Sequence, residues 1–139
     1  MTRARRAVMI VALAFMAPAC GAGSAAPASP QGSWVTASHN LVVTIAPCGA
    51  MMCGMVAQVL ANNSMMGPGE AAVQPLPVGY RLISNLHRDG DHWSGRIFNR
   101  ENGRTYDCTV RKLPDGALEV RPYIVLPLFG RTQIWTHAP

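Results

Sequence analysis

A two-residue alternation of apolar and polar side chains, broken at short intervals by turn dipeptides, constrains this chain more than any other feature. In the segment 104–113, Tyr106, Cys108 and Val110 occupy one face while polar side chains occupy the other. This alternation is typical of a β-strand with one buried face. After the N-terminal leader, no stretch has apolar residues at the three-four spacing of an amphipathic helix, so the sequence predicts an all-β protein.

Eight short strands are expected, at 33–36, 40–46, 54–60, 79–86, 93–99, 104–113, 117–125 and 131–136. Turn sequences such as Asp89-Gly90, Asn102-Gly103 and Pro114-Asp115-Gly116 separate several of them. Evenly spaced short strands indicate a sandwich or a barrel, and short connections favour up-and-down order. At 139 residues there is room for one domain. We therefore expect a small up-and-down β-barrel with a long loop at 61–78.

The first residues are typical of an export signal rather than of a folded element. Three arginines precede an apolar run over 7–17, which is too short to span a bilayer as a helix. Small residues follow, as in a secretory signal peptide. We expect residues 1–28 to be the signal and a small-residue leader, with the barrel domain at 29–139. The segment 20–31, rich in Ala, Gly, Ser and Pro, is expected to be a tether.

Cys20 has two open fates. Cleavage after Ala28 would discard it, whereas a lipoprotein signal ending before Cys20 would make it a lipid-bearing N-terminus. Either outcome places the protein in the periplasm, outside the cell, or on a membrane through a lipid anchor. The net charge of +5 falls to +2 without Arg3, Arg5 and Arg6. No basic stripe remains, so we expect no nucleic-acid partner.

Several segments resemble the bacterial family called domain of unknown function 2147. They are Gly32-Ser33-Trp34, Pro47-Cys48 with Cys53-Gly54, Trp93-Ser94-Gly95-Arg96-Ile97-Phe98, Gly103-Arg104-Thr105-Tyr106 and the segment from Leu126 to Trp135. The resemblance implies an exported protein with a lipocalin-like β-barrel, and it implies no activity. The loop 63–77 and Cys108 depart from the family pattern.

In lipocalin-like barrels a tryptophan of the first strand lies across the barrel floor beneath a cation from the last strand. The resemblance therefore suggests that Arg131 stacks on Trp34, a cation–π contact worth about 0.5–2 kcal/mol. The alternative is that Trp34 is ordinary core and Arg131 ordinary surface. Both stay open on the sequence alone.

Cys48 and Cys53 flank a predicted turn between two strands, and a disulfide between them would fix that hairpin. A copper(I) site that uses Met51, Met52 and Met55, or a redox-active pair, is the less favoured alternative. A second cluster, His87, Asp89, Asp91 and His92, could hold a metal, but a solvated hairpin turn explains it better. We expect no metal site. Cys108 is expected to be a buried, unreactive thiol.

No catalytic motif of the common enzyme families is present, and we expect neither a cofactor nor catalysis. The leading hypothesis is a binding module whose barrel holds a small apolar ligand, with the 61–78 loop as a lid. The expected wall is aromatic: Trp34, Trp93, Phe98, Tyr106 and Trp135. The alternative is an envelope structural or interaction protein with a filled core. An interior volume of about 300 Å³ or more would favour the ligand hypothesis.

Overall fold

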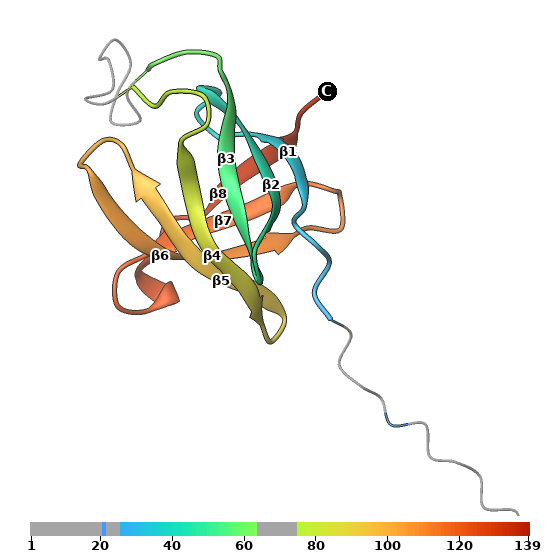
Figure 1. The fold of residues 1–139 in the computed structure, drawn as a ribbon. Coiled ribbons are helices and arrows are strands. Elements are labelled where there is room, and N and C mark those ends of the chain that lie inside the picture. The colour runs from blue at the N-terminus through green and yellow to red at the C-terminus, as the bar shows by residue number, and fades with distance from the viewer. Residues whose placement is uncertain (1–20, 22–25, 64–74) are drawn as a thin grey trace, which may run out of the picture.

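A computed structural model describes residues 21, 26–63 and 75–139. Eight strands, each hydrogen-bonded to the next in sequence order, form a closed antiparallel barrel (Figure 1). This confirms the expected up-and-down, lipocalin-like architecture. The strands are β1 (Gly32–Val35), β2 (Leu41–Cys48), β3 (Met51–Val59), β4 (Arg81–Asp89), β5 (His92–Asn99), β6 (Arg104–Lys112), β7 (Leu118–Tyr123) and β8 (Gln133–His137).

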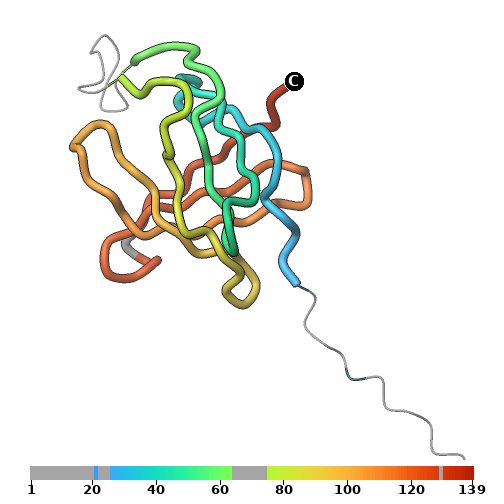
Figure 2. The backbone as a smooth tube through the Cα atoms, viewed as in Figure 1, coloured from blue at the N-terminus to red at the C-terminus, as the bar shows by residue number. Residues whose placement is uncertain are grey.

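Pairing between the first and last strands closes the barrel. Trp34 of β1 lies opposite His137 of β8, and Val35 lies opposite Thr136. The smooth trace in Figure 2 follows the chain around this ring. We call the end with the β1–β2, β3–β4, β5–β6 and β7–β8 connections the mouth. The opposite end, where the chain enters β1 and leaves β8, is the floor.

The interior is filled by side chains from alternate positions, as the two-residue period predicts. On β6, Cys108 and Val110 are fully buried, while Thr105 and Asp107 on the other face are exposed. The largest fully buried apolar side chains come from strands along the whole barrel: Trp34, Trp135, Ile45, Ile83, Leu86, Leu118, Val43, Val56, Val110 and Val120.

The alternation is broken in β4. Asn85 has a left-handed backbone with φ 54°, and the pairing with β5 shifts register between Ser84 and His87. The extra residue of this bulge lets Ile83 and Leu86, three positions apart, both point inward. Gly95 of β5 lies against the bulge, and a Cβ atom at that position would come within 2.9 Å of the Ser84 carbonyl oxygen.

The hairpin between β2 and β3 is tighter than expected. The sequence suggested a turn over 48–53, but Cys48 pairs with Met51, so the turn is only Gly49-Ala50. The strands continue because antiparallel pairing satisfies their backbone groups up to the turn. The expected disulfide between Cys48 and Cys53 is formed, with 5.8 Å between the Cα atoms.

The chain just before β1 belongs to the folded domain. Pro30 is fully buried, its carbonyl oxygen accepts the Trp34 indole N–H at 2.9 Å, and the Ala28 oxygen accepts that of Trp93 at 3.1 Å. The expectation that the whole segment 20–31 is a tether is therefore wrong for residues 28–31. Two buried indoles need acceptors, and this segment supplies them. Cys20 and nearly all of the predicted signal lie outside the described residues.

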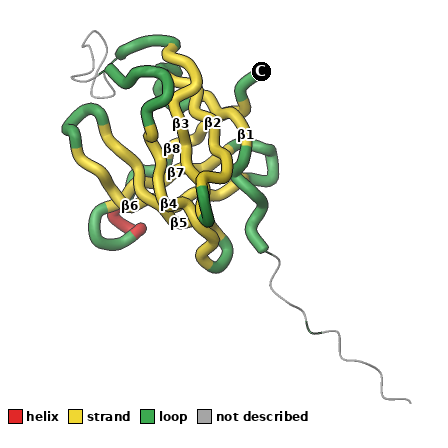
Figure 3. The backbone as a smooth tube through the Cα atoms, viewed as in Figure 1, coloured by secondary structure: helices red, strands yellow, loops and turns green. Residues whose placement is uncertain are grey.

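Helix is scarce in the described part of the chain. A 3-10 turn, η1 (Pro127–Phe129), lies in the β7–β8 connection and is drawn in red in Figure 3. None of the described residues belongs to a helix long and apolar enough to span a membrane.

Candidate functional site at the barrel mouth

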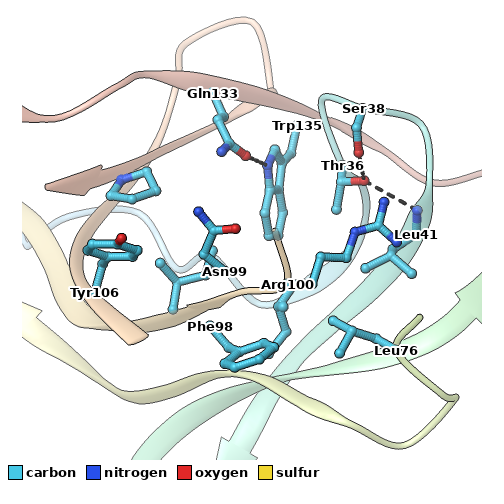
Figure 4. Close-up of a pocket in the computed structure, with 13 residues that line it drawn as sticks. Thr36, Ser38, Leu41, Leu76, Phe98, Asn99, Arg100, Tyr106, Gln133 and Trp135 are labelled. Atoms are coloured by element: carbon cyan, nitrogen blue, oxygen red, sulfur yellow. Dashed lines mark hydrogen bonds between the residues drawn. The ribbon is translucent and has the colours of Figure 1, made fainter. Parts of the chain in front are cut away.

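A cavity of about 80 Å³ opens at the mouth of the barrel. Its apolar wall comes from Leu41, Leu76, Leu82, Ile97, Phe98, Tyr106, Pro122 and Trp135, and its polar groups from Thr36, Ser38, Asn99, Arg100 and Gln133. Figure 4 shows aromatic rings on one side and the Arg100 side chain extending toward Thr36 and Leu41. The site therefore combines an apolar surface with one permanent cation.

Arg100 is the unusual member of this wall, because it is charged and only 6% exposed. Its Nη1 donates to the Asn62 side-chain oxygen and its Nη2 to the Asn63 carbonyl oxygen, both at 2.8 Å. None of the ion pairs between described residues includes it. These neutral oxygens engage two of the five guanidinium N–H groups.

Asn40 holds the same segment from the other side. Its side chain donates to the Asn63 carbonyl oxygen at 2.9 Å and accepts from the Asn63 backbone N–H at 3.0 Å. Asn40 is 1% exposed, and its own carbonyl oxygen accepts the backbone N–H groups of Leu60 and Ala61. Asn40 and Arg100 thus clamp residues 60–63 onto the mouth; we call these side chains the mouth clamp.

Sequence reasoning missed the mouth clamp. Both residues stand in connections between strands, where polar side chains are normally solvated. The segment that they bind is more than 20 positions away from Asn40 and more than 30 from Arg100. Nothing local distinguishes these two polar residues from their solvated neighbours.

The mouth cavity is smaller than the expected ligand chamber. Its 80 Å³ is well below the roughly 300 Å³ at which pockets for drug-sized ligands begin. The rest of the interior is occupied by core side chains such as Trp34, Ile45 and Leu118. Bulky residues thus fill a barrel of this strand number, which favours the alternative of a filled core over an apolar ligand held in the interior.

Three of the five predicted wall residues, Phe98, Tyr106 and Trp135, line the mouth cavity. Trp34 and Trp93 do not, because the strand registers place them at the floor end, where their indoles bind the segment 28–30. Trp93 borders a separate, shallow depression of about 310 Å³ beside the β2–β3 turn. The aromatic residues thus divide between two ends of the barrel.

The cation over Trp34 is Lys112, whose Nζ lies 6.0 Å from the ring centroid. Arg131 does not take this place. Trp34 pairs with His137, and Arg131 lies six positions earlier, roughly 20 Å along an extended chain. His137 packs edge-on against the same indole, with ring centroids 5.0 Å apart. The suggested Trp34–Arg131 pair is therefore wrong, and the end of β6 supplies the cation instead.

The structure accounts for the candidate copper ligands around the β2–β3 hairpin. Both thiols of the Cys48–Cys53 hairpin are in the disulfide, Met52 packs against the core, and Met51 and Met55 are exposed. No group of three or more His, Cys, Asp or Glu side chains that could hold a metal occurs among the described residues.

The β4–β5 turn, which carries the other candidate metal ligands, is an exposed hydrogen-bonded turn. Asp91 accepts a 2.8 Å hydrogen bond from His92, and this bond, helped by the charge of Arg111, lowers the pKa of the Asp91 carboxyl. Asp89 accepts from the Ser94 hydroxyl, while His87 turns away to the Asn85 carbonyl oxygen. The four predicted side chains therefore do not converge on one point.

Cys108 is buried and is not in a disulfide. Burial, with a smaller contribution from the charge of Asp107, raises the pKa of its thiol to about 12. The thiolate is the reactive form of cysteine, so this group is inert at neutral pH. The structure thus agrees with the expected buried thiol.

The family model described as "Uncharacterized protein conserved in bacteria (DUF2147)" matches residues 32–137, which is the whole barrel. The chain belongs to the DUF2147 family. No curated protein matches the chain in sequence. The match begins at β1 and ends with β8, so the unit that defines the family is the closed barrel itself.

A solved structure supports the fold of this DUF2147 barrel. Protein HP1028 from the human pathogen Helicobacter pylori, described as belonging to the lipocalin family, is similar with a TM-score of 0.56. The alignment has 17% sequence identity and covers 78% of this chain and 82% of HP1028. At that identity the likeness establishes a lipocalin-like fold and nothing about ligands.

Proposed function

We propose that this DUF2147 protein is a non-catalytic binding module that takes a small organic anion, a short-chain carboxylate, at the barrel mouth. One observation carries the proposal: the buried Arg100 guanidinium lines a cavity whose other walls are largely apolar. Guanidinium groups bind carboxylates through paired N–H donors, and apolar walls receive a short hydrocarbon chain. The volume of about 80 Å³ limits the ligand to a few heavy atoms.

Titration with acetate, butyrate and hexanoate, followed by calorimetry and by tryptophan fluorescence, tests this proposal. Trp135 lines the cavity, so its emission should change when a carboxylate binds. Butanol serves as the uncharged control and should bind much more weakly. Arg100→Gln should weaken butyrate binding at least tenfold, because a charge-assisted bidentate contact is lost.

Arg104→Gln is the matched control, because this exposed arginine follows the same β5–β6 turn and does not line the cavity. Arg100→Lys, which keeps the charge but not the paired donors, separates charge from geometry. Thermal melting of each variant shows that it is folded. Equal affinity for butyrate in the Arg100→Gln and Arg104→Gln proteins would refute the proposal.

A second candidate function is an envelope interaction protein, and the filled interior favours it. Large side chains occupy the barrel from Trp34 at the floor to Trp135 below the mouth. A packed barrel presents its surface rather than its interior to a partner. If neither carboxylates nor a panel of small apolar compounds changes the melting temperature, this second function is the better explanation.

The proposal includes export to the periplasm or the cell exterior. The basic and apolar leader supports this, as does the Cys48–Cys53 disulfide, because disulfides persist in oxidising compartments. Attachment to a membrane through Cys20 is the lipid-anchored form of the same proposal. Cell fractionation, with the intact mass of the recovered protein, tests both parts.

A further inference from the structure

We propose that the β7–β8 loop, residues 124–130, docks on the surface of a lipid bilayer. Four aliphatic side chains project from it into solvent: Ile124 is 60% exposed, Val125 83%, Leu126 53% and Leu128 79%. Clustered exposed apolar side chains mark interaction sites. This inference gives a partner to the second candidate function and does not depend on the mouth cavity.

Several backbone groups of the loop already have hydrogen-bond partners within the protein. Arg121 donates from Nε to the Pro127 oxygen at 2.7 Å and from Nη2 to the Leu128 oxygen at 3.3 Å. Within the loop, the N–H groups of Leu126 and Gly130 donate to the carbonyl oxygens of Ile124 and Pro127. Unsatisfied backbone groups are costly in lipid, so internal pairing lets such a loop enter the interface.

The loop is also held in an unfavourable conformation. Val125 has φ 68°, in the left-handed region that β-branched residues rarely occupy. This conformation places the side chain outward at the tip, where it has the highest exposure among the large hydrophobic residues described. Gly130 fixes the base of the loop, since a Cβ atom there would clash with the Pro122 carbonyl oxygen. Strain that persists at an exposed apolar tip points to a functional surface.

Charge and size favour a bilayer over a folded protein. The segment 121–132 contains Arg121 and Arg131 and no acidic residue, so anionic lipid headgroups would attract it. A stable protein–protein interface uses about 20–30 residues on each side. Four aliphatic side chains on one seven-residue loop, at the edge of the molecule in Figure 3, are few for that purpose but sufficient for interfacial insertion.

The first experiment locates insertion with a reporter tryptophan. Leu128→Trp places the reporter in the loop, and Met51→Trp places a matched one, on a residue 43% exposed, at the floor end. Both proteins are prepared from their own host in processed form and mixed with vesicles of equimolar phosphatidylglycerol and phosphatidylcholine. We expect a blue-shifted emission, quenched by brominated acyl chains, for Leu128→Trp only. No shift in Leu128→Trp, or equal shifts in the two proteins, overturns the proposal.

The second experiment measures affinity for the same vesicles by sedimentation. Ile124→Ser and Leu128→Ser should each weaken binding roughly tenfold, because each removes a large aliphatic side chain from the buried set. Met51→Ser is the control and should bind as the natural protein does. Arg131→Gln should weaken binding several-fold on anionic vesicles and leave binding to pure phosphatidylcholine unchanged.

Other outcomes separate the competing explanations. If the serine variants bind vesicles normally but change the size of the protein in solution, the loop is a protein contact and the membrane proposal fails. If Arg100→Gln loses butyrate binding but still binds vesicles, the result supports the carboxylate site at the mouth cavity alone. If Leu128→Ser loses vesicle binding but still binds butyrate, the result supports membrane docking through the β7–β8 loop alone.

Discussion

Arg100 and Asn63 lie 37 positions apart in sequence, yet the Arg100 guanidinium donates to the Asn63 carbonyl oxygen at 2.8 Å. The same oxygen accepts from the Asn40 amide at 2.9 Å. Two buried polar side chains from two different connections therefore meet on one peptide group. Such a buried network is strong only while each member is satisfied, which makes it sensitive to single substitutions.

Asn40→Ala should lower the free energy of unfolding by about 1–3 kcal/mol. The substitution removes both side-chain hydrogen bonds to Asn63, so that its backbone N–H loses this acceptor while its carbonyl oxygen keeps only the bond from Arg100. Urea unfolding measures the change. Asn102→Ala is the control, because the hydrogen bonds of this exposed side chain to described residues lie within its own hairpin. Equal stability of the two variants would show that the mouth clamp contributes little.

Gly95→Ala should destabilise the barrel by about 1–3 kcal/mol through overpacking. A Cβ atom would come within 2.9 Å of the Ser84 carbonyl oxygen and 3.1 Å of the Leu86 Cα, both of which are backbone atoms of the β4 bulge. The comparison is Thr105→Ala on the exposed side of β6. The measurement is thermal or urea unfolding. If Gly95→Ala were as stable as the natural protein, Gly95 would not lie so close to the β4 backbone.

The buried Cys108 thiol predicts a loss of stability in alkali. Its folded pKa of about 12 lies above the ordinary value of 9.0, so above pH 9 the unfolded state binds fewer protons than the folded state. The stability that the protonated Cys108 thiol gives to the folded state is fully present below pH 9 and is lost as the pH rises toward 12. By pH 10.5 we expect about 2 kcal/mol of loss from this group.

Urea unfolding at several pH values, with Cys108→Ala as the reference, isolates the thiol from tyrosine and lysine titration. The variant should lose less stability than the natural protein between pH 9 and 10.5. Parallel pH profiles for the two proteins would mean that the thiol is accessible to water.

The floor contacts predict where the processed chain begins. The Ala28 carbonyl oxygen accepts the indole N–H of Trp93, which is only 7% exposed, so cleavage after Ala28 would remove that residue from the floor. We expect the mature N-terminus to lie upstream of Ala28, as cleavage before Cys20 would provide. Intact mass spectrometry of protein from its own host gives the answer, and a chain that starts at Ser29 would contradict this expectation.

Much of the fold is predictable because its signals are local. Alternation along 104–113 correctly separates the buried Cys108 and Val110 from the exposed face, and Asp89-Gly90 and Asn102-Gly103 mark hairpin turns. The Cys48–Cys53 disulfide is also predictable from local sequence, since both residues flank a single turn. The Asn85 bulge is the local exception, because the interior packing of Ile83 and Leu86 selects it.

Outside the β4 bulge, the sequence by itself determined which side chains point inward and how many strands there are. The tertiary structure decided at what height along the barrel each side chain lies. Height depends on the registers that close β1 onto β8, and these pairings join residues about 100 positions apart. For that reason Trp34 meets Lys112 rather than Arg131, and Trp93 lies at the floor while Trp135 lies at the mouth. The clamp of Asn40 and Arg100 on Asn63 exists only after closure, because the ring of strands brings three distant connections to one end.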